Sequence, residues 1–112
     1  PDILIFSFSR FRNPVMKINK RVDFPLKNLC LGNVCEKNED RNAKYDLIGV
    51  SNHKGSMMGG HYTSYCKNGN GSWYHFNDSN VDEIDDPNQV ISNEAYVVVY
   101  ERKKIDIQKI IN

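Results

Sequence analysis

The 112-residue sequence lacks any apolar run long enough to cross a membrane, and it lacks a large excess of either charge. A membrane-spanning helix needs roughly 20 consecutive apolar residues, and no stretch comes near that length. Fifteen basic and 14 acidic side chains give a formal net charge of +1. Because nucleic acids and anionic membranes bind concentrated positive charge, neither is expected as the main partner.

Cysteine is also scarce, with three in the chain. An odd number without a disulfide framework is typical of a reducing compartment, so we expect an intracellular protein of the cytoplasm or the nucleus. Cys30 and Cys35 are followed by His53, His61 and His75, but no second pair at zinc-ligand spacing appears. The sequence therefore predicts no metal site, and no pattern indicates another cofactor.

The chain begins without methionine and without a secretory signal, and Pro1 and Asp2 lead directly into an apolar segment. We therefore expect a piece of a longer protein. At 112 residues, that piece is one domain or part of one.

The most informative stretch has two aromatic-rich segments, 62–66 and 73–76, on either side of an Asn-Gly-Asn-Gly sequence. Aromatic and β-branched residues favour strands, and the asparagines and glycines accept the positive φ angles of a tight hairpin turn. When this hairpin folds, His61 at the start of the first strand lies beside Asn77 and Asp78 at the end of the second. The sequence therefore predicts an imidazole next to an amide and a carboxylate.

An imidazole held by a polar partner is two thirds of a nucleophilic triad. In this arrangement the side-chain oxygen of Asn77 accepts a hydrogen bond from Nδ1 of His61, and Nε2 is left to face the nucleophile. Asp78 can do the same or act through a bound water. The alternative is that His61 is an ordinary strand-end residue and that Asn77 and Asp78 only form a turn, as such residues commonly do.

The remainder of the chain predicts a strand-rich domain. Residues 85–90 predict one capped turn of helix, with Pro87 near its first position. Gly49 indicates a β-bulge or close packing inside a strand. Residues 36–44 predict a surface loop, and residues 102–112 predict a helix or a frayed tail. Strands are expected over residues 3–11, 15–18, 21–24, 45–53, 81–84 and 95–100, the last of them central in the sheet.

None of the three cysteines is favoured as a nucleophile. The segment from Leu31 to Cys35 is similar to a nucleophile box, but the acidic residues that follow would oppose formation of a thiolate. Cys30 and Cys66 lie in an apolar segment and in a predicted strand, so we expect both to be packing residues.

At the hairpin the sequence resembles the ubiquitin-specific protease family, a papain-like class of deubiquitinating cysteine proteases. Residues 59–65, Gly-Gly-His-Tyr-Thr-Ser-Tyr, resemble the family's histidine box. Residues 73–81, Trp-Tyr-His-Phe-Asn-Asp-Ser-Asn-Val, resemble the box that holds the third triad member. Further matches in the family's order and spacing are Phe-Ser-Arg-Phe at 8–11, Val-Asp-Phe-Pro at 22–25, and the segments 45–53 and 95–100.

The resemblance implies an α+β, β-dominated fold, in which residues 1–101 are the C-terminal part of the catalytic domain. Its antiparallel sheet would be part of the palm of a papain-like cysteine protease. His61 would be the general base and Asn77 the third triad member. Asp78 would be the acidic neighbour that supports the oxyanion.

The resemblance also implies a substrate and partners. The loop before His61 would shape the channel for ubiquitin's C-terminal Gly-Gly tail, with Gly59, Gly60 and Tyr62 as substrate-binding residues. The expected partners are ubiquitin, ubiquitinated proteins and the upstream half of the same catalytic domain, which would hold the catalytic cysteine. The piece alone would then be inactive. The alternative is a ubiquitin-binding module that does no chemistry.

Overall fold

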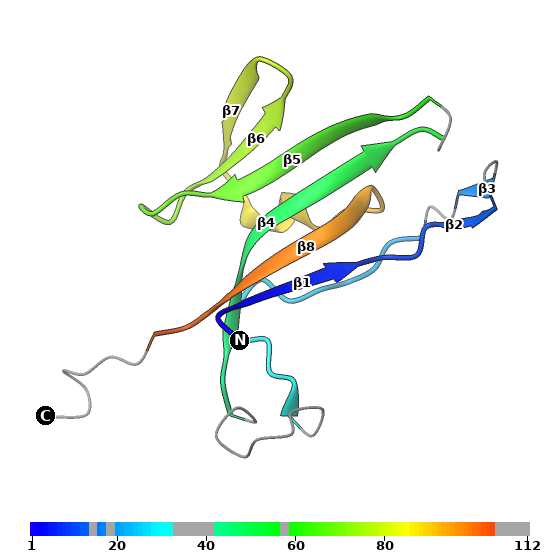
Figure 1. Ribbon diagram of the computed structural model, residues 1–112. Helices are drawn as coiled ribbons and strands as arrows, with labels where there is room; N and C mark the ends of the chain where they lie inside the picture. The colour runs from blue at the N-terminus through cyan, green and yellow to red at the C-terminus, as the bar shows by residue number, and fades with distance from the viewer. Residues whose placement is uncertain (14–15, 18–19, 33–41, 57–58, 105–112) are drawn as a thin grey trace, which may run out of the picture.

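The computed structural model describes residues 1–13, 16–17, 20–32, 42–56 and 59–104, and its main feature is one antiparallel sheet of six strands (Figure 1). The strand order is β1-β8-β4-β5-β6-β7, and β2 and β3 form a separate two-stranded ribbon. Among the described residues, no helix has the length and apolar character that a membrane crossing requires. The elements are β1 (Ile3–Ser7), β2 (Phe11–Asn13), β3 (Met16–Lys17), β4 (Tyr45–Lys54), β5 (His61–Lys67), β6 (Trp73–Asn77), β7 (Asn80–Ile84), the 3-10 helix η2 (Pro87–Val90) and β8 (Ala95–Arg102).

Three consecutive hairpins, β4–β5, β5–β6 and β6–β7, supply four of the six strands of the sheet, and β8 lies between β1 and β4. The position of β8 confirms that the segment from residue 95 is an interior strand, as its run of β-branched valines predicts. The register of β4 against β8 shifts at Gly49, which confirms the predicted bulge. The predicted helical turn is also present as η2, where the Asp86 side chain accepts a hydrogen bond from the Asn88 N–H at 3.0 Å.

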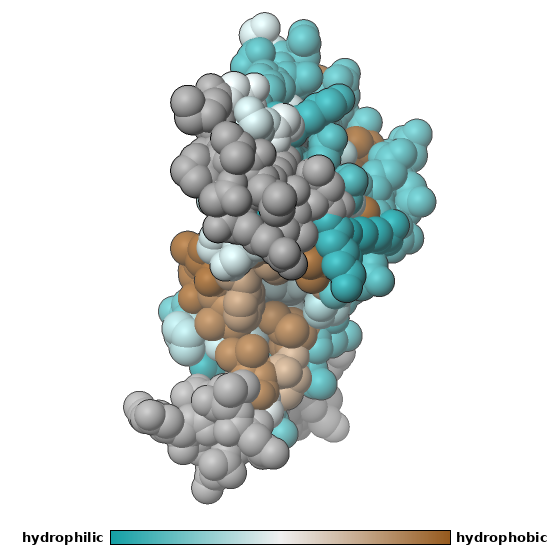
Figure 2. Space-filling view, turned by 90° about the vertical axis from the view of Figure 1, so that its right-hand side faces the viewer, coloured by the Kyte–Doolittle hydropathy of each residue, from teal (hydrophilic) through white to brown (hydrophobic). Residues whose placement is uncertain are grey.

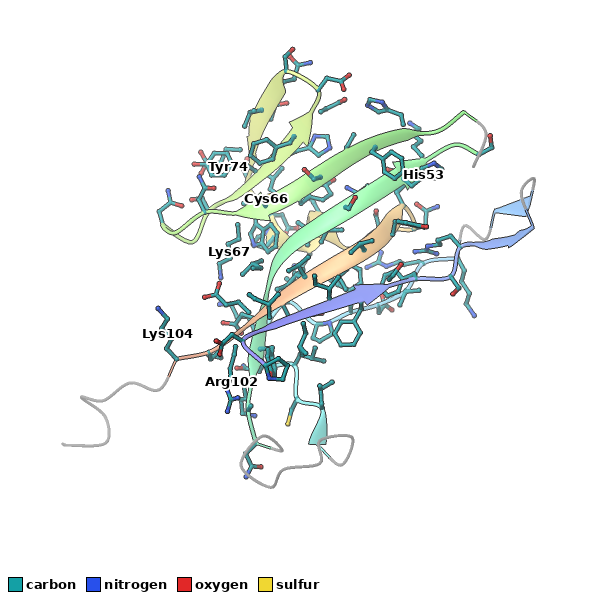
Figure 3. The ribbon with its side chains drawn as sticks, in the orientation of Figure 1. His53, Cys66, Lys67, Tyr74, Arg102 and Lys104 are labelled. Atoms are coloured by element: carbon teal, nitrogen blue, oxygen red, sulfur yellow. The ribbon has the colours of Figure 1, made fainter. Side chains whose placement is uncertain are left out.

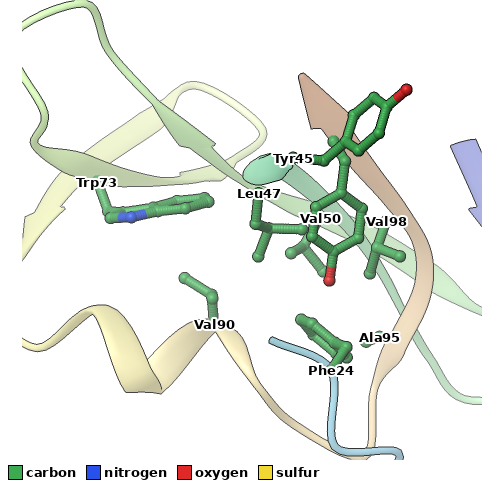
Figure 4. Close-up of a cluster of buried hydrophobic side chains, with 9 residues drawn as sticks. Phe24, Tyr45, Leu47, Val50, Trp73, Val90, Ala95 and Val98 are labelled. Atoms are coloured by element: carbon green, nitrogen blue, oxygen red, sulfur yellow. The ribbon is translucent and has the colours of Figure 1, made fainter. Parts of the chain in front are cut away.

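The hydrophobic core lies on one face of the sheet. Figure 4 shows Phe24 and Val90 opposite the side chains of β4 and β8, with Trp73 at one side. Burial of one such aliphatic side chain stabilises the fold by roughly 1.5–3 kcal/mol, so this cluster fixes the sheet against η2. The buried members are Phe24, Tyr45, Leu47, Val50, Trp73, Val90, Ala95, Val98 and Tyr100.

The β1 side of the sheet leaves apolar surface in contact with solvent. Ile3 is 46% exposed and Ile5 is 67% exposed, although both lie in a strand. Apolar residues, including Phe6, Phe24 and Leu29, also line an open groove of about 290 Å³. Figure 2 shows apolar side chains gathered over part of one face, next to described residues that are largely hydrophilic. The edge strand β1 is therefore more apolar than exposed sheet edges usually are.

The predicted strand over residues 21–24 is wrong. This segment is irregular and pairs with no strand among the described residues. Phe24 turns into the core instead, and Arg21 forms a local ion pair with Asp23 at 2.9 Å. Burial of one aromatic side chain therefore decides the path of this segment, and a local preference for extended backbone does not.

The strand predicted over residues 3–11 is divided. β1 ends at Ser7 and β2 begins at Phe11. Between them the chain leaves the sheet, and the buried Arg10 directs its guanidinium to the carbonyl oxygen of Ala95. The short strand predicted within residues 15–18 corresponds in part to β3.

Several expectations concern segments that the structure describes only in part. Cys35, residues 36–41 of the predicted loop and residues 105–112 of the predicted tail lie outside the described residues. Arg102 is the last residue of β8, so the strand extends one residue into the segment expected to be tail. The prediction that Cys30 is a packing residue is wrong: Leu29 packs against the core and bridges to Tyr45, and its neighbour Cys30 is exposed. Cys66 is half-buried in β5.

Candidate active site

The candidate site lies at one end of the β5–β6 hairpin. Ser64 is paired with Phe76 and Tyr65 with His75, a register that continues to place Asn77 opposite Thr63. His61, the first residue of β5, lies two residues before Thr63, so its side chain shares a face of the sheet with Thr63 and Asn77. The two residues are thus diagonal neighbours across the hairpin.

His61 lies beside Asn77, as the hairpin predicts, with Nε2 2.8 Å from Oδ1. The prediction that Nδ1 would meet Asn77 is wrong. Diagonal neighbours are about 7–8 Å apart, further than directly opposed residues, so the outer ring nitrogen makes the contact. Because the amide oxygen accepts from Nε2–H, the neutral ring keeps the lone pair of Nδ1 available for a proton.

Asp78 occupies the two-residue turn between β6 and β7, where Asn77 is paired with Asn80. Its φ angle of 53° is in the left-handed region, which aspartate tolerates better than most residues. The turn holds the carboxylate in solvent, next to the contact between His61 and Asn77 but outside it. A supporting role for Asp78 in catalysis stays a prediction.

The loop before His61 is tightly packed at one glycine and open at another. A Cβ on Gly60 would clash with the Nε2 edge of the His53 ring, 2.5 Å from Cε1 and 2.8 Å from Cδ2, whereas a Cβ on Gly59 would meet nothing within 4 Å. The ring of His53 therefore fills the space beside Gly60 that a side chain would need. A role of Gly59 and Gly60 in substrate binding stays a prediction. Tyr62, on the other side of His61, is 59% exposed.

Two buried polar residues of β4 next to the site were not identified from the sequence as candidates. Asn52 donates a hydrogen bond from Nδ2 to Oγ1 of Thr63 at 3.3 Å. His53 is paired across the strands with Tyr62. The signal that could have identified them is the polar end, Ser-Asn-His, of a strand that is otherwise largely apolar.

Arg10 is a third buried polar residue, and it anchors the start of β8. Its Nε and Nη2 donate to the carbonyl oxygen of Ala95 at 3.0 and 2.7 Å, and Nη1 donates to the carbonyl of Lys20. The guanidinium also lies 5.4 Å from the centroid of the Phe8 ring. Burial lowers the pKa of Arg10 from its ordinary value of 12.5. Because Ala95 pairs with Asn52, Arg10 fixes the start of β8 beside the buried polar end of β4.

The described part of the chain offers no cysteine to the His61 imidazole. Cys66 pairs with Gly49 and Tyr74, and its position in β5 places it on the opposite face from His61. No group of three or more potential metal ligands forms among the described residues. The geometry therefore provides an imidazole held by an amide oxygen, with the lone pair of Nδ1 available for a proton. The role of His61 as a general base stays a prediction.

Comparison with known sequences gives one consistent family. The family model described as ubiquitin carboxyl-terminal hydrolase matches residues 1–100. Ubiquitin carboxyl-terminal hydrolase 8 of Arabidopsis thaliana is 43% identical over 108 residues, which are 91% of this chain and 12% of that protein. Ubiquitin carboxyl-terminal hydrolase 2 of Homo sapiens is 42% identical over 105 residues, which are 90% of this chain and 17% of that protein. The chain thus spans less than a fifth of the length of these relatives.

Solved structures agree with the sequence comparison. A structure of the yeast SAGA DUB module matches 95% of this chain and 24% of its own chain, with a TM-score of 0.80 and 30% identity. A structure of the SAGA DUB module bound to ubiquitin aldehyde matches 95% of this chain and 25% of its own, with a TM-score of 0.77 and 30% identity. These likenesses confirm the expected fold class, the β-dominated, antiparallel part of a papain-like fold.

Proposed function

This chain belongs to the ubiquitin carboxyl-terminal hydrolase family, and we propose that it supplies the general base and its orienting residue to a deubiquitinating cysteine protease. The observation that supports the proposal most directly is the 2.8 Å contact between Nε2 of His61 and Oδ1 of Asn77. No described cysteine faces His61, so the catalytic cysteine would come from the upstream half of the same catalytic domain. The 12% and 17% coverage of the relatives is compatible with such a division.

In the proposed reaction, Nδ1 of His61 takes the proton of the cysteine thiol, and the thiolate attacks the carbonyl carbon of ubiquitin's C-terminal glycine. The imidazolium then gives its proton to the leaving amine, and the peptide or isopeptide bond breaks. A thioester between ubiquitin and the cysteine remains. His61 next takes a proton from water, whose oxygen attacks the thioester. The C–S bond breaks, ubiquitin leaves with a free carboxyl group, and the cysteine sulfur takes the proton back from His61. Throughout, Asn77 keeps the ring in one tautomer and one orientation.

The residues around the base fit the substrate. An extended Gly-Gly tail has no side chains and can pass close to the glycine-rich loop, where Gly59 has open space beside it. Gly60 and the exposed ring of Tyr62 would form the adjoining wall. Asp78, in its exposed turn, would hold a water that donates to the oxyanion. An oxyanion-hole donor typically contributes about 2.7–4 kcal/mol to the stability of the transition state.

The partners follow from the reaction. We propose that ubiquitin and ubiquitinated proteins bind here, which is supported by the similarity to a DUB module that was solved with ubiquitin aldehyde. A thiol nucleophile needs a reducing environment, so we place the reaction in the cytoplasm or the nucleus.

The experiment that tests this function uses the full-length protein and ubiquitin with an electrophile at its C-terminus. We expect peptide mass spectrometry to find the label on a cysteine upstream of Pro1. We expect His61→Ala to abolish turnover, and Cys35→Ala, the control, to keep most of it. Turnover that survives His61→Ala would contradict the proposal. A label on Cys35 would overturn the division of the triad, and ubiquitin binding without label or turnover would favour the non-catalytic module.

A further inference from the structure

A second histidine, His53, lies in β4 next to the candidate site, where it is paired with Tyr62, the residue after His61. Figure 3 shows it near the end of β4 that leads into the β4–β5 loop. His53 is 2% exposed, and its ring centroid lies 4.8 Å from that of Tyr62 and 6.2 Å from that of Tyr96. The two tyrosine rings are also in edge contact, 6.5 Å apart. The imidazole of His53 is therefore enclosed by aromatic rings from β5 and β8.

The backbone of His53 is fixed as firmly as its ring. Its N–H donates to the carbonyl oxygen of Glu94 at 2.9 Å, in the turn that leads into β8. Its direct partner across the hairpin is Tyr62, the residue after His61. His53 itself is on the opposite face of the sheet from the contact between His61 and Asn77, because its neighbour Lys54 is the partner of His61.

Gly60 packs directly against this enclosed ring. Its missing Cβ would overlap the imidazole, so only glycine fits while the ring stays in place. The backbone of Gly55 also lies close to Gly60: a Cβ on Gly55 would be 3.2 Å from the Cα of Gly60. Gly55 has a φ angle of 102°, a conformation suited to glycine. The backbone of Gly60 is thus held between the His53 ring and the turn of the loop.

We propose that His53 is a positioning residue for His61. Its ring is the support that fixes Gly60, and the backbone at Gly60 sets where the Cα and Cβ of the next residue, His61, lie. This inference rests on the proposed function, in which His61 is the base. His53 does not touch substrate or reacting atoms, and it acts only by fixing the backbone that enters β5.

A disturbance of this support changes catalysis by an amount that can be measured. A methyl group at residue 60 forces either the ring or the backbone to move by a distance on the order of an ångström. A misplacement of about 1 Å at a catalytic group can lower the rate 100-fold. Because substrate does not reach His53, its loss acts on kcat and leaves the KM for ubiquitin nearly unchanged.

The test is a double-mutant cycle in the full-length protein, with the variants Gly60→Ala, His53→Ala and the two combined. The substrate is ubiquitin with a fluorogenic amide on its C-terminal glycine. We expect Gly60→Ala to lower kcat by about 100-fold and His53→Ala to lower it less. In the double variant the methyl group occupies the space of the missing ring, so kcat is expected to rise to the level of His53→Ala. A double variant whose loss equals the product of the two single losses would overturn the inference.

Two control variants separate this contact from a general effect of added methyl groups. Gly69→Ala adds a methyl group in the β5–β6 turn, where it meets nothing within 4 Å, and we expect kcat to be unchanged. Gly59→Ala lies beside Gly60 but away from the ring, so we expect its effect, whatever its size, to be independent of His53→Ala. Coupling of His53 to Gly59 as strong as its coupling to Gly60 would contradict the proposed contact.

A readout that needs no turnover separates failure of this inference from failure of the proposed function. The ring ¹⁵N resonances of His61 report its hydrogen bond to Asn77. We expect Gly60→Ala to shift these resonances relative to the wild-type protein. We expect the same change to leave them unshifted when it is made in His53→Ala. If the wild-type protein shows no turnover, the proposed function fails while these resonances still test the support. Thermal unfolding verifies that each variant is folded, and His53→Val replaces His53→Ala in the cycle if the alanine variant does not fold.

Discussion

Replacement of Asn77 by alanine measures how much of the proposed activity depends on the hydrogen-bond partner of His61. Oδ1 of Asn77 lies 2.8 Å from Nε2 of His61, and Nε2–H becomes part of a cation when Nδ1 takes a proton. A hydrogen bond to a charged group contributes about 1.5–3 kcal/mol. Because His61 is exposed, water can replace the amide oxygen in part, which favours the lower end of this range. About 1.5 kcal/mol corresponds to a loss of roughly tenfold, and about 3 kcal/mol to more than 100-fold.

The assay is steady-state cleavage of ubiquitin that has a fluorogenic amide at its C-terminus, by the full-length protein. We expect Asn77→Ala to lower kcat by about 10- to 100-fold with little change in KM, because the hydrogen bond forms with the base and not with substrate. Asn77→Asp keeps an acceptor oxygen at the same place and is expected to restore most of the activity. Asn80→Ala, opposite Asn77 in the β6–β7 turn, is the matched control and is expected to resemble the wild-type protein.

Two results would refute the reasoning. If Asn77→Ala has the kcat of the wild-type protein, the contact with His61 is not needed in the transition state. If Asn77→Asp is as slow as Asn77→Ala, an acceptor oxygen is not what the imidazole requires. A rise in KM with unchanged kcat would instead place Asn77 in substrate binding.

Three further predictions concern stability. Leu47→Ala removes a fully buried side chain and is expected to lower the free energy of unfolding by about 2–5 kcal/mol, measured by urea titration; a loss below 1 kcal/mol would contradict its place in the core. Arg10→Lys cannot reproduce the two hydrogen bonds to the carbonyl of Ala95, so we expect a loss of about 1–3 kcal/mol in the same titration, and a variant as stable as the wild-type protein would refute this role. Burial raises the pKa of Tyr100 to about 12. As the pH rises, the unfolded chain therefore loses the phenol proton before the folded chain does. We expect the free energy of unfolding to be unaffected below about pH 10 and to fall between about pH 10 and 12. Thermal unfolding of Tyr100→Phe should show a smaller fall over the same range, and an equal fall would contradict the assignment.

The parts of the fold that depend on neighbouring residues could be predicted from the sequence. The β5–β6 hairpin follows from aromatic residues on both sides of an Asn-Gly-Asn-Gly turn, and it brings His61 to Asn77. The nitrogen that meets Asn77 could not be predicted in this way, because it depends on whether the two residues are opposed directly or diagonally. A shift of register by two residues would change the answer without changing the pattern.

Other features depend on contacts between distant segments and leave little trace in the sequence. Phe24 leaves the extended path expected for its segment because the core under β4 and β8 has room for its ring. The sequence predicts Gly60 only as part of the loop before His61, yet the ring of His53, seven residues earlier, fills the space where a Cβ at residue 60 would lie. Buried polar residues at the end of an apolar strand are the one local sign of such an arrangement.

The strand order also determines the sequence in which the sheet can assemble. β4, β5, β6 and β7 are joined by successive hairpins, whose contacts are close in the chain and form quickly. Among the described strands β1 pairs only with β8, with Ile3 opposite Glu101, so this pairing must wait until almost the whole described chain has left the ribosome. During that interval β1 lacks its pairing with β8, and a chaperone or a neighbouring nascent chain can bind its isoleucines. The contact between His61 and Asn77, by contrast, is complete as soon as one hairpin has closed.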